Sequence, residues 1–143
     1  MTETVASQFE SALERYKAGE DVANLIPVFQ EICDRAPKSS AAWTCLAWLY
    51  LLNDKPSAAV KAAQKAVKLH PQDAQSRVNL AVAMLETGQK GVRQHIDSAM
   101  QLITIDSEMR DEIQQSIADG LSRKPDWKNL ERVRKWLFEP DEG

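Results

Sequence analysis

The fold is decided by residues 40–73, SAAWTCLAWLYLLNDKPSAAVKAAQKAVKLHPQD. Large apolar residues alternate with alanines at helical spacing, and the stretch closes on Pro71. The turn signal at residues 53–56 divides it into two helices, since Asp54 is a suitable N-cap and Pro56 is tolerated in a first turn. Small side chains allow two helices to approach closely. The stretch therefore predicts a helical hairpin.

The hairpin recurs along the chain. Residues 35–37, Arg-Ala-Pro, are followed 34 residues later by Leu-His-Pro at 69–71, and this spacing is a repeat period of helix-turn-helix units. Frames of this length cover residues 6–39, 40–73 and 74–107. No segment alternates apolar and polar residues for long, so strands are poorly supported and the chain is predicted to be all-α.

The middle frame resembles the tetratricopeptide repeat family. That family's order of Trp, Leu, small and aromatic residues, then three small or aromatic residues and a proline, is matched by Trp43, Leu46, Ala47, Tyr50, Ala59, Ala63, Ala66 and Pro71. The first frame keeps the large residues but has Leu13 at a small position. The resemblance implies a right-handed α-solenoid of about three hairpins, within a single domain over residues 1–143.

The third frame departs from the pattern in its second helix. Arg93, Asp97 and Ile105 stand where the family has a small residue, an aromatic and the proline. We expect this helix to pack in a shifted register. In the first frame, Pro27 follows Asp21 by several residues and predicts a late helix start or a kink.

Helical patterning continues after the third frame. Apolar residues recur at helical spacing up to Leu121, and a second amphipathic stretch begins at Trp127. A solenoid needs a terminal element to cover its last hairpin. We therefore predict C-terminal capping helices over about residues 108–138.

Composition narrows the function classes. The net charge is −3 and the sequence pI is near 5.4, which disfavours general binding to nucleic acid or to anionic membranes. The most apolar stretch, residues 41–52, is too short to span a bilayer, so no membrane insertion is expected. The first ten residues have neither a basic head nor an apolar run, so we expect no secretory signal and a cytoplasmic location.

Catalytic and metal-binding patterns are missing from the sequence. Cys33 and Cys45 lack ligand spacing and are expected to be reduced core thiols. His70 and His95 have no sequence neighbours that suggest a catalytic set, and no phosphate-binding loop, zinc helix or nucleophile elbow occurs. We expect a chain that is not an enzyme and that uses no cofactor and no metal.

The resemblance implies that function lies on the concave face formed by the first helix of each repeat. The partner-binding residues carried over by register are Glu10, Glu14, Thr44, Trp48, Leu51, Val78, Val82 and Leu85. The family's clamp for a free carboxylate uses Lys, Asn and Arg at such positions. Acidic and apolar residues stand here instead, so such a clamp is not expected. An aromatic such as Trp48 is a suitable anchor for an apolar helix or extended segment.

The predicted function is a non-catalytic scaffold or assembly factor that binds an apolar or amphipathic protein segment. In one alternative, the chain's own C-terminal helix covers Trp48 through Trp127, Leu130 and Trp136, or the corresponding helix of a second copy does so in a homo-oligomer. In another, the outer face with Lys61, Lys65 and Lys68 binds RNA or an acidic protein. Nucleic acid is the less expected partner, because helical repeats that read RNA usually carry more aromatic side chains on the reading face.

Overall fold

The computed structural model describes residues 3–139, which form helices and connecting turns and no strand. The helices are α1 (Val5–Lys17), α2 (Val22–Arg35), α3 (Ser40–Leu52), α4 (Pro56–Leu69), α5 (Ala74–Glu86), α6 (Val92–Ile105), α7 (Ser107–Arg123) and α8 (Lys128–Phe138). The all-helical prediction is confirmed. The predicted domain also includes residues 1–2 and 140–143, which lie outside the described residues.

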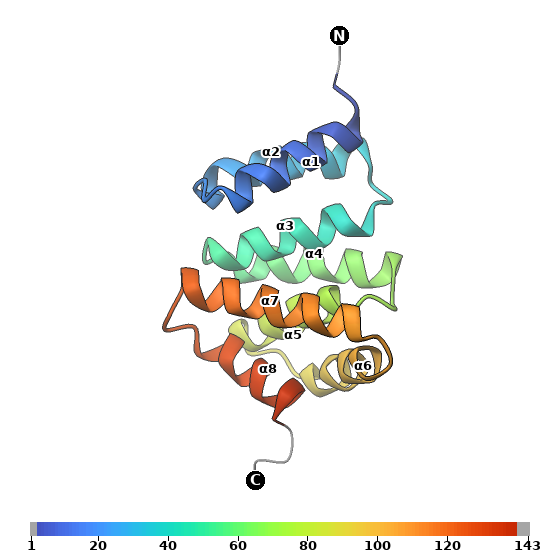
Figure 1. Cartoon of the computed structure of the whole chain (residues 1–143), viewed down its shortest axis with the longest axis vertical. Coiled ribbons are helices and arrows are strands. Elements are labelled where there is room, and N and C mark those ends of the chain that lie inside the picture. Colours follow the sequence, from blue (N-terminus) through green and yellow to red (C-terminus); the bar gives the residue numbers. More distant parts are fainter. Residues whose placement is uncertain (1–2, 140–143) are drawn as a thin grey trace.

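The helices stack as hairpins along the long axis of the molecule (Figure 1). The pair α1 and α2 forms one end, and the pair α3 and α4 packs beneath it, followed by α5 and α6. The helix α7 then turns back over the stack and leads into α8 at the other end. No helix within residues 3–139 has both the length and the apolar character needed to cross a membrane.

Small side chains hold the middle hairpin together. Ala47 on α3 and Ala59 and Ala63 on α4 are fully buried, and these two helices pack directly against each other. An alanine at such a contact lets the helix axes approach and leaves no void. The close packing predicted from the alanine spacing is therefore present.

Polar side chains define most helix starts. The side chains of Thr4, Asp21, Ser39, Asp73 and Asp106 each accept a hydrogen bond from a backbone N–H in the first turn of the following helix. Such a bond satisfies one of the donors left free at a helix N-terminus. The helices α1, α2, α3, α5 and α7 all begin in this way.

Two predictions about helix starts are wrong. Asp54 is not the N-cap of α4: Lys55 takes that position, and Asp54 adopts a φ of 58°, which Asp tolerates because of its short polar side chain. The late start predicted for α2 as one of two alternatives is not found, because Asp21 caps the helix directly and the helix continues through the exposed Pro27; the other alternative, a kink at Pro27, stays a prediction. The buried Leu25 and Phe29 anchor it on both sides of the proline.

The second helix of the third hairpin, α6, is shifted relative to its counterparts α2 and α4, as its departure from the pattern predicted. The turn before α4 spans residues 53–55, whereas the turn before α6 spans residues 87–91. The longer turn places Gly88 and Gly91 at positive φ, a backbone conformation that favours glycine. Consequently α6 begins and ends two residues later than the repeat period requires.

Candidate functional site

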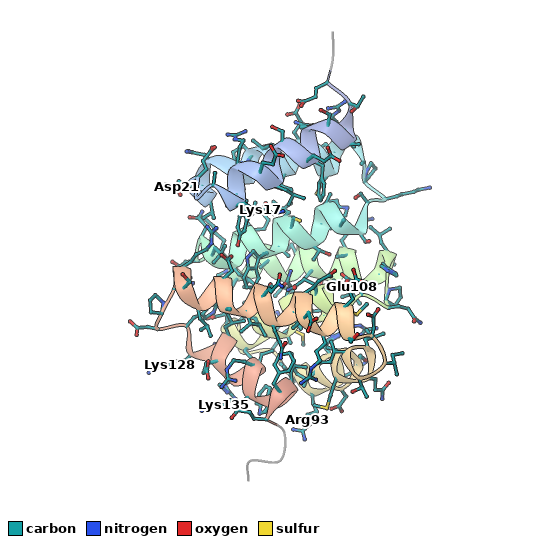
Figure 2. The ribbon with its side chains drawn as sticks, viewed as in Figure 1. Lys17, Asp21, Arg93, Glu108, Lys128 and Lys135 are labelled. Carbon is teal, nitrogen blue, oxygen red and sulfur yellow. The ribbon has the colours of Figure 1, made fainter. Side chains whose placement is uncertain are left out.

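The concave face of the stack is formed by α1, α3 and α5, which we call the inner helices, and it is partly covered by α7 and α8, which we call the C-terminal arm (residues 107–138). Figure 2 shows Glu108, near the start of α7, on the side of the molecule opposite Lys17, the last residue of α1. The helix α7 therefore runs back toward the C-terminal end of α1. Its last turns reach the inner helices there.

Trp48 on α3 is the point where the arm meets the inner helices. Its side chain is only 8% exposed, and its ring lies 5.5 Å from that of Trp127. Gly120 of α7 packs against its edge so closely that an added Cβ would lie 2.8 Å from Cη2 of Trp48. Glycine at this position is thus what allows α7 to seat on the indole.

A polar network surrounds this contact. The indole N–H of Trp48 donates to the hydroxyl of Tyr16 at 2.9 Å, and that hydroxyl donates to the carboxylate of Asp119. Burial and then the Asp119 hydrogen bond raise the pKa of Tyr16 well above its usual value. The phenol therefore stays protonated and serves as a donor.

Arg123 closes the network from α7. Its Nε donates to Asp119 at 3.1 Å, its Nη2 donates to the backbone carbonyl of Tyr16 at 3.0 Å, and its guanidinium lies 4.0 Å from the centre of the Tyr16 ring. A cation on an aromatic face and a charge-assisted hydrogen bond both stabilise the contact. The last turn of α7 is thereby tied to the C-terminal end of α1.

The next residues tie the arm to α3 and α5. Lys124 Nζ donates to the carbonyl of Leu51 at 3.2 Å and to the carboxylate of Asp54 at 2.7 Å. The indole N–H of Trp127 donates to Glu86 at 2.7 Å. A cation at the C-terminus of a helix is favoured by the helix dipole, and Lys124 takes that place at the end of α3.

The predicted partner-binding residues fall into two groups. Glu10 and Glu14 are exposed on α1, whereas the others are buried or half-buried on α3 and α5. The buried or half-buried residues are Thr44, Trp48, Leu51, Val78, Val82 and Leu85. In this structure α5, which carries three of them, packs against α3, α7 and α8.

The alternative in which the chain's own C-terminal segment covers Trp48 matches part of this geometry. Trp127 lies on Trp48, and a Cδ of Leu130 lies beside Gly120 at the same contact. Trp136 differs: its ring stacks with Arg132 at 5.0 Å and is half-buried on α8. Its position in the sequence four residues after Arg132 explains that pairing.

Sequence reasoning missed Tyr16, Asp119, Arg123 and Lys124. Asp119 and Arg123 are spaced as an ordinary ion pair on a helix surface, and their partner Tyr16 is about a hundred residues away. The spacing of this pair, beside Gly120 in the interior of α7, is the only local signal of a contact surface on this helix.

An open groove of about 480 Å³ remains between the inner helices and α7. Its floor is mostly apolar, its rim is polar, and two predicted residues, Thr44 and Trp48, line it. The lining residues are Leu13, Tyr16, Lys17, Phe29, Thr44, Cys45, Trp48, Leu49, Gln75, Asn79, Glu112, Gln115, Ser116, Asp119 and Arg123. Glu10 and Glu14 are not part of the lining, but Glu10 shares the α1 face of Leu13 and Lys17 by helical spacing.

The polar groups at the floor of the groove are satisfied within the protein. Asn79 is fully buried, donates to the backbone carbonyl of Thr44 at 3.0 Å, and accepts from Gln75 at 2.8 Å. Burial raises the pKa of the Cys45 thiol to about 12, so the thiol is protonated at neutral pH. These groups fix α5 against α3 and leave the floor of the groove uncharged.

Two other features of the sequence have plain structural settings. Lys61, Lys65 and Lys68 are exposed on the outer face of α4, and their binding to RNA or an acidic protein stays a prediction.

The pKa of His95 is lowered, first by burial and then by the charge of Arg77. Nη1 of Arg77 lies 3.1 Å from Nδ1 of this histidine. Among residues 3–139, no group of three His, Cys, Asp or Glu side chains could hold a metal ion.

Comparisons with known proteins support the helical repeat fold. A family model described as "Tetratricopeptide repeat" matches residues 40–83. No curated protein matches the sequence. Several solved structures share the fold.

Among them is the type III secretion translocator chaperone SycD of Yersinia enterocolitica in an alternative dimer, with a TM-score of 0.70, 15% identity and coverage of 94% of each chain. A structure titled "MamA MSR-1 C2" has a TM-score of 0.62 and 18% identity, and covers 93% of this chain and 78% of the other. Another, titled "Crystal structure of MamA protein", has a TM-score of 0.57 and 18% identity, and covers 97% and 74%. The chain therefore carries a tetratricopeptide repeat at residues 40–83, set in an all-helical repeat fold.

Proposed function

We propose that this chain is a non-catalytic scaffold or assembly factor of the cytoplasm that binds an apolar or amphipathic segment of a partner protein. The observation that carries the proposal is the open groove between the inner helices and α7. A concave surface with an apolar floor and a polar rim is the usual setting for a bound segment. The repeat fold, shared with the type III secretion translocator chaperone SycD, is consistent with this role.

The proposed binding residues would contact different parts of the partner segment. Thr44 and Trp48 provide the floor on which an apolar side chain of the partner would rest. Glu10 and Glu14 are exposed on α1, where their carboxylates would select basic residues at one end of the segment. Leu51, Val78, Val82 and Leu85 are buried or half-buried in this structure, so they would contact the segment only when the C-terminal arm leaves the inner helices.

The groove can be blocked from its rim without disturbing its floor. Gln115 is exposed on α7 and lines the groove, whereas its neighbour Gln114 is also exposed and does not line it. Gln115→Trp fills the groove with an indole, and Gln114→Trp places the same side chain outside it. The two variants therefore form a matched pair on one helix.

The test begins with proteins captured by the immobilised wild-type chain from a lysate of its host. Each captured candidate is purified and titrated against the wild type and both variants. We expect Gln115→Trp to weaken binding by about tenfold or more, as loss of an anchoring contact does, and Gln114→Trp to leave the affinity unchanged. Equal affinities for all three proteins would refute the groove as the binding surface.

A further inference from the structure

The junction between α6 and α7 differs from the other two junctions between hairpins. Residues 36–39 connect α2 to α3, and residues 70–73 connect α4 to α5. Each of these connections contains a proline, Pro37 or Pro71. Only Asp106 separates α6 from α7, and no proline is present there.

Proline and loop length both keep successive helices apart. A proline in a helix interior removes a hydrogen bond and clashes with the preceding turn, so it disfavours the joining of two helices into one. At the third junction, the position one repeat period after Pro71 is occupied by Ile105. This junction has therefore lost both the proline and the spacer that separate the helices elsewhere.

One residue alone keeps α6 and α7 apart. Asp106 has φ −133° and ψ 100°, serves as the C-cap of α6 and the N-cap of α7, and accepts a hydrogen bond from the Met109 N–H at 3.0 Å. If this residue adopted helical angles, α6 and α7 would form a single helix over residues 92–123. The arm would then point away from its own inner helices.

Ile105 indicates where such a joined helix would be buried. Its side chain is 84% exposed, and no other large hydrophobic residue among residues 3–139 is exposed. In a continuous helix it would share one stripe with Leu102 and Met109, which are half-buried here and lie three residues before it and four residues after it. An apolar stripe of that kind requires a partner surface.

We propose that two copies of this chain exchange their C-terminal arms, with α6 and α7 joined into one helix in each copy. The arm of each copy then occupies the other copy's inner helices through the contacts it makes within one chain here. The polar groups complement each other: Lys124 forms an ion pair with Asp54, and the indole N–H of Trp127 donates to the Glu86 carboxylate. Exchange of an identical element between protomers preserves these contacts at little cost, and the two stripes containing Ile105 pack together near the symmetry axis.

Arm exchange does not require the proposed partner protein, but it changes which copy of the chain supplies the α7 residues of the groove. Glu112, Asp119 and Arg123 line the groove from α7, so in the exchanged dimer each groove is completed by residues of the second copy.

Two substitutions at the junction move the equilibrium in opposite directions. Asp106→Ala removes the cap of α7 and puts the strongest helix former at the joint, so it favours the joined helix. Ser107→Pro places proline at the first position of α7, where it is tolerated, and keeps Asp106 extended. It therefore prevents the joined helix while leaving the folded single chain intact.

The experiment measures the mass of the full chain in solution across a wide range of protein concentrations. We expect the dimer dissociation constant of Asp106→Ala to be lower than that of the wild type by about tenfold or more, given the typical energies of caps and helix propensity. We expect Ser107→Pro to have the mass of one chain throughout. As a matched control, Asp73→Ala removes the equivalent cap of α5 at a junction that keeps Pro71, and it should dimerise no more than the wild type.

A second readout separates arm exchange from any other association. The backbone N–H groups of Ser107 and Glu108 start α7 and would gain partners in the preceding turn of a joined helix. Their hydrogen exchange should therefore slow in the Asp106→Ala dimer. The proposal is overturned if Asp106→Ala keeps the mass of one chain at every concentration, if Ser107→Pro dimerises as strongly as Asp106→Ala, or if these two amides stay unprotected in the dimer.

Discussion

Gly120 of α7 lies against the edge of the Trp48 indole, at a separation that admits no side chain: an added Cβ would be 2.8 Å from Cη2 and 2.9 Å from Cζ2. Glycine in the interior of a helix costs about 1 kcal/mol relative to alanine. This cost is offset because glycine allows the C-terminal arm to pack directly against α3. This relationship makes the arm a specific part of the fold rather than a loose cover.

Gly120→Ala should lower the free energy of unfolding by about 1–2 kcal/mol, since overpacking the core outweighs the gain in helix propensity. Chemical denaturation measures this loss. Ser122→Ala, exposed on the same helix, serves as a control and should be nearly neutral. In a Trp48→Phe background the Gly120→Ala cost should fall in part, because the clashing atoms Cη2 and Cζ2 of the indole are gone while Leu130 Cδ2, 2.7 Å from the added Cβ, remains; an unchanged cost would show that the clash does not involve the indole.

Trp48→Ala should lower the free energy of unfolding by about 3–5 kcal/mol, as is usual for truncating a buried aromatic residue. Trp48 is almost fully buried and contacts both the arm and Tyr16, so the expected effect is on folding as well as on binding. Trp43→Ala is the comparison, because that ring is only partly buried and should cost less. If Trp48→Ala folded as stably as the wild type, the arm would not rest on this residue in solution.

The middle hairpin could be predicted because its determinants are local. Ala47, Ala59 and Ala63 follow the spacing that two close helices require, and their burial confirms it. The same holds for the shifted register of α6, since the missing proline and extra glycines are visible in the sequence. Such patterns depend on residues within one hairpin, and these residues are close together in the sequence.

The arm's seat on the inner helices could not be predicted residue by residue. Asp119, Arg123 and Lys124 have the composition of a solvated helix end, and their partners on α1 and α3 are far away in the sequence. Gly120 looks like a helix terminator, yet α7 continues to Arg123. Only the three-dimensional path of α7 reveals that a small residue there meets a tryptophan.

Arg123→Ala should lower the free energy of unfolding by about 1–2 kcal/mol, because it removes both a cation on the Tyr16 ring and a hydrogen bond to the Tyr16 carbonyl. Arg93→Ala provides the control: Arg93, like Arg123, pairs with an Asp four residues away in the sequence, but at 4.0 Å and with both side chains exposed. Exposed pairs contribute little, so Arg93→Ala should be nearly neutral. Similar losses for the two variants would indicate that Arg123 acts only as a surface charge.

Tyr16 should make the protein's stability depend on alkaline pH. Its pKa is raised in the folded state above the ordinary value of 10.0, by burial and by the hydrogen bond to Asp119, so the unfolded chain loses the phenolic proton first. Fewer protons are then bound in the unfolded state, and the free energy of unfolding falls as the pH rises. The contribution is complete below pH 10 and is lost progressively above it.

Tyr16→Phe isolates this effect from the titration of lysines and thiols, which both proteins share. At about pH 8 the variant should be less stable than the wild type by about 1 kcal/mol, the net value of a typical buried hydrogen bond. Between about pH 10 and pH 11 the difference should narrow, because only the wild type has the Tyr16 phenol to ionise on unfolding. Denaturation curves at both ends of this range measure the difference. A constant difference across the range would mean that the Tyr16 phenol titrates alike in the folded and unfolded chains, and that its bond to Asp119 does not hold the arm in solution.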